Sequence, residues 1–137
     1  METFLAAKEQ IFISNSVVDE EIAYHYMRDK KQRFQHINEH IQTNFAIVKE
    51  WMAQQEDMEW VEPSGGVVCF PRIKPTSDVD VDKFYQVLNK VYKTFVGPGH
   101  WFEYDRRHMR IGYGWPTADE LRGGLENITQ ALMAAKD

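Results

Sequence analysis

The residues with the clearest chemical potential lie in the stretch RHMRIGYG, at positions 107–114. If this stretch is a β-strand, alternate side chains point to opposite faces, so Arg110 and Gly112 share one face. A guanidinium offers two parallel N–H donors that match a carboxylate, and a neighbouring glycine lets a ligand come close. A structural ion pair between Arg110 and one of the 21 acidic residues would also explain the pattern. Both interpretations stay open at this point.

A second candidate is the segment His36-Ile37-Asn38-Glu39-His40, which matches the H-x-x-E-H pattern of inverted zinc proteases. On a helix, His36 and His40 lie about one turn apart and could share a metal ion. A catalytic zinc ion needs a third protein ligand, and no suitable glutamate stands out downstream. We therefore favour a solvated helix face and predict no metal site.

Composition narrows the classes of function. The chain has 137 residues, 43% of them hydrophobic, which suits one domain with its own core. Its formal net charge of −5 argues against a broad nucleic-acid surface, and no apolar stretch is long enough to cross a membrane. The single cysteine, Cys69, lies in an apolar run, so we expect a small buried hydrophobe in a reducing compartment. These features predict a cytoplasmic protein whose partners include neither nucleic acid nor membrane.

A long helical region should come first among the elements that position these side chains. From Val17 to about Gln55 there is no glycine or proline, and apolar residues recur at helical spacing. Ser16 followed by Asp19 resembles a capping box, so the helix should begin there. We expect one long helix, or two helices joined near the charged run at 28–33. A single helix would be about 50 Å long, so part of it should project or pack on something else.

Shorter elements follow, each bounded by turn and capping residues. We expect, in order, a strand at 58–61, a turn at 63–66, a strand at 67–70, a loop between Pro71 and Pro75, a helix from a cap at 77–80 to Phe95, an extended piece at 100–104 and the strand with Arg110. A last helix should begin at Thr117, with Glu120 completing a capping box. This order predicts an α+β fold: a long N-terminal helix, then a small mixed or antiparallel sheet covered on one face by helices.

Four motifs occur in sequence order: PSGGVVCF at 63–70, VGPGHWF at 96–102, RHMRIGY at 107–113, and DEL at 119–121 with Gly124-Leu125. Together they resemble the C-terminal, small domain of class I/II, fold-type-I aminotransferases, which use pyridoxal phosphate. The long helix before them is similar to the helix that links the two domains of that family. The resemblance covers essentially the whole chain, but only about the last third of a complete enzyme. It implies a small-domain-like region at 17–137, preceded by a remnant of the linker or large domain at 1–16.

The resemblance also implies roles for particular residues. In that family, the arginine at the position of Arg110 binds the α-carboxylate of the substrate. The segment Ser64-Gly65-Gly66 and Gly112 would line the same cleft. A complete enzyme would use pyridoxal phosphate to transfer an amino group from an amino acid to a 2-oxo acid.

The sequence departs from the family where the cofactor would be held. No lysine has the Ser-x-Ser-Lys-like context of the family's Schiff-base lysine, and the phosphate and pyridinium sites belong to the large domain. We therefore expect no catalytic or cofactor-binding residue in this chain, no bound pyridoxal phosphate and no activity of the chain alone. A free-standing interaction module, forming a homodimer through an exposed N-terminal helix, remains the alternative function.

Overall fold

A computed structural model describes residues 3–4, 6–7 and 16–136. The chain divides into two compact units, Met1–Asn38 and Glu39–Asp137. The division falls within helix α3 (Lys30–Ala53). Most of the segment 1–16, which we expect to be a linker or large-domain remnant, lies outside the described residues.

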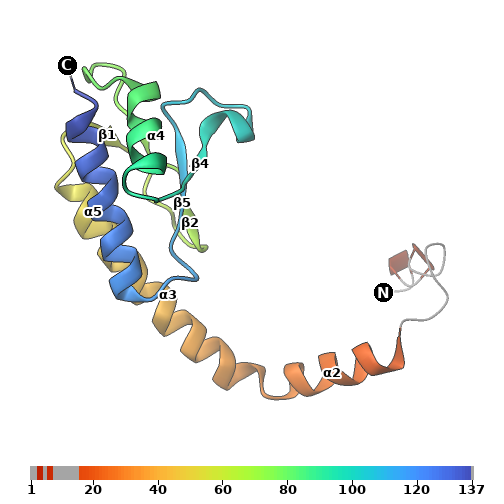
Figure 1. Cartoon of the computed structure of the whole chain (residues 1–137). Helices are drawn as coiled ribbons and strands as arrows, with labels where there is room; N and C mark the ends of the chain where they lie inside the picture. The colour runs from red at the N-terminus through yellow and green to blue at the C-terminus, as the bar shows by residue number, and fades with distance from the viewer. Residues whose placement is uncertain (1–2, 5, 8–15, 137) are drawn as a thin grey trace. The chain divides into compact units, whose positions relative to one another are not determined.

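The described part of the first unit is helical. Helix α2 (Val17–Arg28) begins at the predicted cap, where the hydroxyl of Ser16 accepts a hydrogen bond from the backbone N–H of Asp19 at 3.4 Å. It ends at Arg28 with Asp29 as its C-cap, so the region forms two helices joined in the charged run (Figure 1). No residue of α2 is buried. The exposed apolar side chains of this unit include Val17, Val18, Ile22, Tyr24, Tyr26, Met27, Phe34 and Ile37.

The second unit is built around strand β5 (Met109–Gly112), the predicted strand. It lies between β2 (Val68–Cys69) and β4 (Gly97–Pro98) in an antiparallel sheet of order β2-β5-β4. Strands β1 (Met58–Glu59) and β3 (Arg72–Ile73) form a second antiparallel pair. A bridge between Arg72 and His108 brings that pair beside the start of β5.

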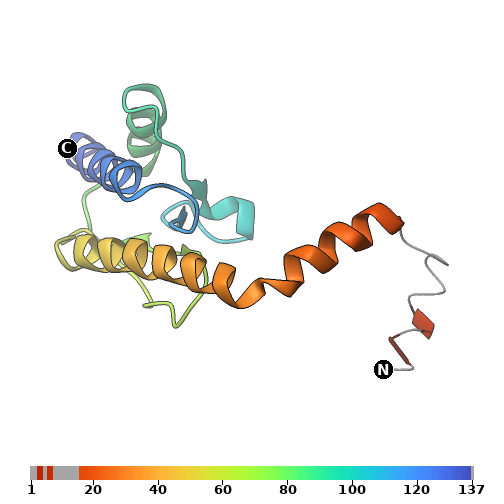
Figure 2. The ribbon, with the colours of Figure 1, turned by 90° about the horizontal axis from the view of Figure 1, so that it is seen from below.

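Helices cover one side of this sheet. Helix α4 (Val81–Lys90), helix α5 (Ala118–Ala134) and the C-terminal part of α3 lie on the same side of β5 (Figures 1 and 2). The largest fully buried side chains of the unit are Tyr113, Phe84, Ile73, Leu88, Met109, Ile128, Val48, Asn44 and Pro71. Helix α5 begins with the predicted capping box between Thr117 and Glu120. The α+β fold predicted from the order of elements is therefore confirmed.

Two expectations about loops were wrong. The segment between Pro71 and Pro75 contains strand β3. The prolines flank the pairing without interrupting it, because the Pro71 carbonyl accepts from Met109 N–H and Ile73 N–H donates to the Arg107 carbonyl, both at 2.9 Å. The expected extended piece at 100–104 is instead a 3₁₀-helix, η1 (Gly99–Phe102), closed by a 3.1 Å hydrogen bond from Tyr104 N–H to the Gly99 carbonyl.

The bounds of other elements also differ from expectation. The N-cap of helix α4 is Asp80, and the helix ends at Lys90. Phe95 therefore lies outside the helix, and 75% of its surface is exposed. Lys93 adopts a φ of 52°, a left-handed conformation that ends helical propagation in this segment. The strands expected at 58–61 and 67–70 contain only two residues each in the structure.

Candidate functional site

Arg110 lies on the open face of the three-stranded sheet. Met109 and Ile111 are buried against the helices, whereas Arg110 and Gly112 are exposed. Tyr113, which continues the apolar side, is only 1% exposed. The predicted alternation of the RHMRIGYG stretch is thus confirmed, and Arg110 is directed away from the core.

Side chains from two helices fix the backbone on either side of β5. The hydroxyl of Tyr85, on α4, lies 3.0 Å from the Arg106 carbonyl oxygen and 3.1 Å from that of His108. Burial raises the pKa of this hydroxyl to about 12, so it stays protonated and can donate. At the other end, the amide nitrogen of Asn44, on α3, donates to the carbonyls of Tyr113 and Pro116, each at 2.8 Å. Both termini of the arginine-bearing strand are therefore anchored to the helical layer.

The guanidinium of Arg110 rests on an aromatic ring. Its Cζ lies over the ring of Phe102, 4.8 Å from the ring centroid, within the range of a cation–π contact. Within the described part of the chain, no carboxylate forms an ion pair with Arg110. The described residues thus do not provide the structural ion pair that the sequence left open. Arg110 is exposed, and no described residue accepts a hydrogen bond from its guanidinium.

Gly112, which was also expected to line the cleft, lies on the same strand as Arg110. Gly112 is paired with Val68 across the sheet, and a Cβ at Gly112 would meet no atom within 4 Å. The space on that side of β5 is open, as the sequence suggested. Gly112 is two residues from Arg110 on the same face, about 7 Å along the strand.

The turn at 64–66 lies farther along, beyond the carboxyl end of β5. The carbonyl of the next residue, Val67, accepts hydrogen bonds from the backbone of Tyr113 and Gly114 at 2.9 and 3.1 Å. Ser64, Gly65 and Gly66 are exposed, and Gly66 has a φ of +100°, which favours glycine. The antiparallel register therefore places this turn past Gly112, not directly beside Arg110.

Sequence reasoning missed Phe102 as a neighbour of Arg110. The contact depends on η1, which folds back over β4 and cannot be predicted from local periodicity. One signal was available, because the motif VGPGHWF places two glycines shortly before an aromatic residue. A Cβ at Gly97 would lie only 3.1 Å from Cε2 of Phe102, so this glycine makes room for the ring.

The histidines of the H-x-x-E-H segment form no recognisable metal centre. His40 Nε2 lies 3.3 Å from the amide nitrogen of Asn44. Among residues 3–4, 6–7 and 16–136, no cluster of three or more His, Cys, Asp or Glu side chains could hold a metal ion. The same residues include no helix long and apolar enough to cross a membrane.

Cys69 is the buried hydrophobe that the sequence predicted. It is 3% exposed, on β2, and burial raises the pKa of its thiol to about 12. A thiol with this pKa carries almost no thiolate at neutral pH, so it is a poor nucleophile. The structure thus supports a packing role for Cys69.

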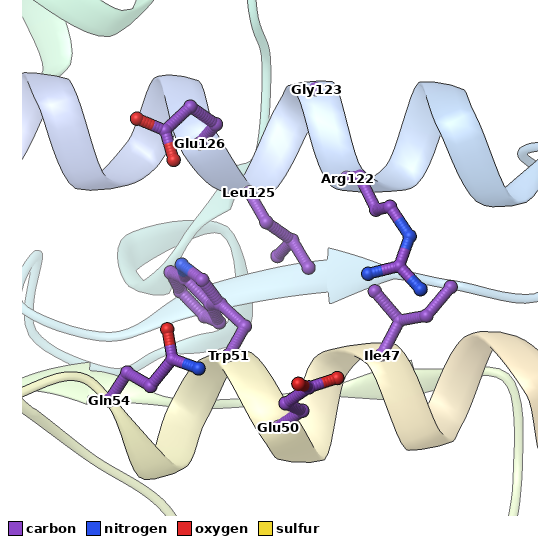
Figure 3. Close-up of a pocket in the computed structure, with 8 residues that line it drawn as sticks. All are labelled: Ile47, Glu50, Trp51, Gln54, Arg122, Gly123, Leu125 and Glu126. Carbon is purple, nitrogen blue, oxygen red and sulfur yellow. The ribbon is translucent and has the colours of Figure 1, made fainter.

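A pocket of about 440 Å³ opens between α3 and α5, with β5 behind it (Figure 3). Its floor is apolar and its rim charged, and its lining residues are Ile47, Glu50, Trp51, Gln54, Arg122, Gly123, Leu125 and Glu126. The indole N–H of Trp51 donates to the Thr129 hydroxyl at 2.9 Å, which ties the two helices together. None of the residues proposed from the sequence lines this pocket, so it is separate from the Arg110 face.

No protein-family model and no curated protein matches the sequence. Solved structures do match the fold. A pyridoxal-phosphate-dependent aminotransferase from Streptococcus suis 89-1591 aligns with a TM-score of 0.79 at 21% identity, over 95% of this chain and 34% of that one. The pyridoxal-phosphate-dependent cyclase OrfR aligns with a TM-score of 0.76 at 23% identity, over 93% of this chain and 35% of the cyclase. The α-aminoadipate aminotransferase LysN from Thermus thermophilus gives 0.69 at 10% identity, over 82% of this chain and 29% of LysN.

These similarities establish the fold. The chain has an aminotransferase small-domain-like fold, as the four motifs and the long helix suggested. It spans about a third of the length of the two structures with the higher TM-scores, 34% and 35%.

Proposed function

We propose that this chain is the substrate-carboxylate-binding, C-terminal domain of a pyridoxal-phosphate-dependent aminotransferase. The complete enzyme would transfer an amino group from an amino acid to a 2-oxo acid in the cytoplasm. In it, Arg110 binds the substrate carboxylate, and Ser64, Gly65, Gly66 and Gly112 border the cleft. Pyridoxal phosphate would supply the electron sink for the chemistry, and this chain would supply orientation of the substrate.

The observation that carries this proposal is the setting of Arg110. Its guanidinium is exposed, lies over the ring of Phe102 and faces the open side of a sheet whose next position on that face is Gly112. A fixed cation beside open space is suited to a carboxylate, which accepts two parallel N–H donors from one guanidinium. The fold that the chain shares with solved aminotransferases also supports the proposal that Arg110 binds a carboxylate.

A titration of the chain with pyruvate, followed by the side-chain Nε–Hε signals in nitrogen-15 NMR spectra, tests carboxylate binding. A charge-assisted contact of about 1.5–3 kcal/mol corresponds to a dissociation constant of about 10–100 mM. We expect the Arg110 signal to shift saturably, and Arg110→Gln to remove the response. Neutral pyruvamide at matched ionic strength is the control ligand, and Arg122, exposed on α5, is the control arginine. An equal response to pyruvate and pyruvamide would refute the assignment.

We further propose that the chain alone neither holds pyridoxal phosphate at a specific site nor transaminates. Its lysines lack the sequence context of the family's cofactor lysine, and the large-domain residues that would align the cofactor are not in this sequence. Mixing equimolar pyridoxal phosphate with micromolar protein should leave the visible absorption of the cofactor unchanged. A stoichiometric change at such low concentration, lost on mutation of one lysine, would contradict this.

A second candidate function, an interaction module that forms a homodimer, is favoured by the surface of α2. None of its residues is buried, and apolar side chains such as Val17, Ile22 and Met27 are 79%, 52% and 62% exposed. Apolar surface of this kind marks association sites. Sedimentation analysis between micromolar and millimolar concentrations should show a mass that rises toward twice 16.1 kDa. A constant monomer mass, unchanged in an Ile22→Ser, Met27→Ser variant, would exclude this function.

A further inference from the structure

The side chains around Arg110 form a connected aromatic cluster on the open face of the sheet. The register pairs Gly97 of β4 with Arg110 of β5, so these two residues share a face. On the same face, the ring of His108 is stacked on that of Phe70, with centroids 5.4 Å apart and planes at 21°. Phe70 in turn meets Phe102 edge to face at 5.7 Å and 86°. The ring beneath the guanidinium is therefore held by other rings.

Backbone constraints hold Phe102 in this place as well. A Cβ at Gly99 would lie 2.0 Å from the backbone oxygen of Asp105, so only glycine fits where η1 begins. Gly99 N–H donates to the His108 carbonyl at 2.7 Å, which binds the start of η1 to the segment leading into β5. Because η1 spans only Gly99–Phe102, this hydrogen bond also restricts the position from which the Phe102 side chain extends.

A glycine makes the contact between ring and guanidinium possible. A Cβ at Gly97 would lie 3.1 Å from Cε2 and 3.3 Å from Cζ of Phe102, and 3.4 Å from Cβ of Arg110. Contacts of 3.1–3.3 Å would require the ring to move by a few tenths of an ångström. Gly97 thus leaves the space in the sheet into which Phe102 fits beside Arg110.

We propose that Phe102 is a positioning residue for Arg110. The inference rests on the proposed carboxylate-binding function and assigns the residue that sets the geometry of that site. An arginine side chain on an open surface samples many rotamers, and binding must then restrict them. A guanidinium stacked on a ring has fewer rotamers to lose, and its N–H groups stay free at the ring edge to bind a carboxylate.

The expected effect on binding is modest and specific. Replacing Phe102 by leucine should weaken pyruvate binding by about two- to five-fold, the range expected for an exposed cation–π contact. Phe102→Tyr keeps the ring and should bind like the unmodified chain. Gly97→Ala leaves both contacting side chains in place but requires the ring to move by a few tenths of an ångström, so its effect should have the same direction as that of Phe102→Leu and be smaller.

The experiment measures two quantities on the Arg110 Nε–Hε signal, identified by its loss in Arg110→Lys. The first is the upfield ring-current shift without ligand, which is expected in the unmodified chain and in Phe102→Tyr, lost in Phe102→Leu and reduced in Gly97→Ala. The second is the pyruvate dissociation constant of each variant. Backbone amide spectra verify that each variant is folded, and the Arg122 signal should stay constant.

The outcomes distinguish the positioning role of Phe102 from the proposed carboxylate binding by Arg110. Equal pyruvate affinity in the unmodified chain and Phe102→Leu, with a normal response at Arg110, overturns the positioning role and leaves carboxylate binding intact. No ring-current shift in the unmodified chain overturns the stacking itself. A clear ring-current shift without any response to pyruvate refutes the proposed function and, with it, the role given to Phe102. Loss of the shift together with weaker binding in Phe102→Leu, a smaller change of both quantities in Gly97→Ala, and unmodified behaviour in Phe102→Tyr support the proposal.

Discussion

Replacing Asn44 by alanine tests how the strand that carries Arg110 is anchored. Asn44 is fully buried, and its amide donates to the carbonyls of Tyr113 and Pro116, both at 2.8 Å. The substitution leaves the buried Tyr113 carbonyl and the half-buried Pro116 carbonyl without this donor, and an unsatisfied buried group costs about 1–3 kcal/mol. Loss of the Asn44 Oδ1 atom, which is buried without a partner, offsets part of this cost, as does the higher helix propensity of alanine. We expect a net loss of about 2–4 kcal/mol.

This loss is large compared with the total stability of a small domain, about 5–15 kcal/mol. Urea unfolding followed by tryptophan fluorescence should show a midpoint lower by about 1–2 M, given the usual dependence of unfolding free energy on urea. Gln42→Ala, an exposed position on the same helix, is the matched control and should change stability by less than about 0.5 kcal/mol. Asn44→Asp should be at least as damaging as alanine, because a carboxylate cannot donate to either carbonyl. The reasoning is refuted if Asn44→Ala unfolds at the same urea concentration as Gln42→Ala.

Three further predictions concern other parts of the second unit. Cys69, whose thiol pKa is raised to about 12 by burial, should react with a disulfide reagent at neutral pH only as fast as the protein unfolds; immediate reaction in native buffer would contradict its buried position. Desolvation raises the pKa of Asp57, but hydrogen bonds from Lys136 and Ser77 outweigh it, so the pKa in the folded protein lies below 3.8. The stabilising contribution of this carboxylate is therefore present above pH 3.8 and is lost as the pH falls through the lower pKa of the folded state. Thermal unfolding of Asp57→Asn should therefore differ most from the unmodified chain above about pH 4 and converge with it in stronger acid; a constant difference at all pH values would argue against this. Gly99→Ala should prevent folding or strongly destabilise the folded protein, because its Cβ would lie 2.0 Å from the Asp105 backbone oxygen. Gly65→Ala should be almost neutral, because nothing lies within 4 Å of the added Cβ. Similar thermal unfolding midpoints for the two variants would show that the turn at Gly99 is looser than described.

Signals that are local in the sequence predicted the structure well. The capping residues Ser16 and Thr117 lie next to the helix starts that they define, and the alternation in β5 needs only one buried face. The sequence could not decide between one long helix and two helices joined near the charged run, because such a run neither forbids nor requires a helix. Local chemistry therefore specified where elements begin, and less securely where they end.

Features that depend on distant segments were missed. Strand β3 is flanked by prolines, which by themselves favour a loop. It forms because Pro71 and Ile73 make backbone hydrogen bonds with residues at and just before the start of β5. The 3₁₀-helix η1 owes its shape to contacts of Gly99 with the segment around His108. For the same reason, Arg110 could be proposed as a candidate from the sequence, but the ring of Phe102 beneath it could not.

The edge strand β4 has a consequence for how molecules of this chain can meet. An exposed sheet edge normally offers unpaired N–H groups to which a strand of another molecule can add. In β4, one of the two residues is Pro98, which has no amide N–H to donate. The sheet therefore ends at a strand that is a poor template for further pairing, next to the side chain of Arg110. Arg110 can face open solvent on this sheet while the adjoining edge resists the strand addition that leads to aggregation.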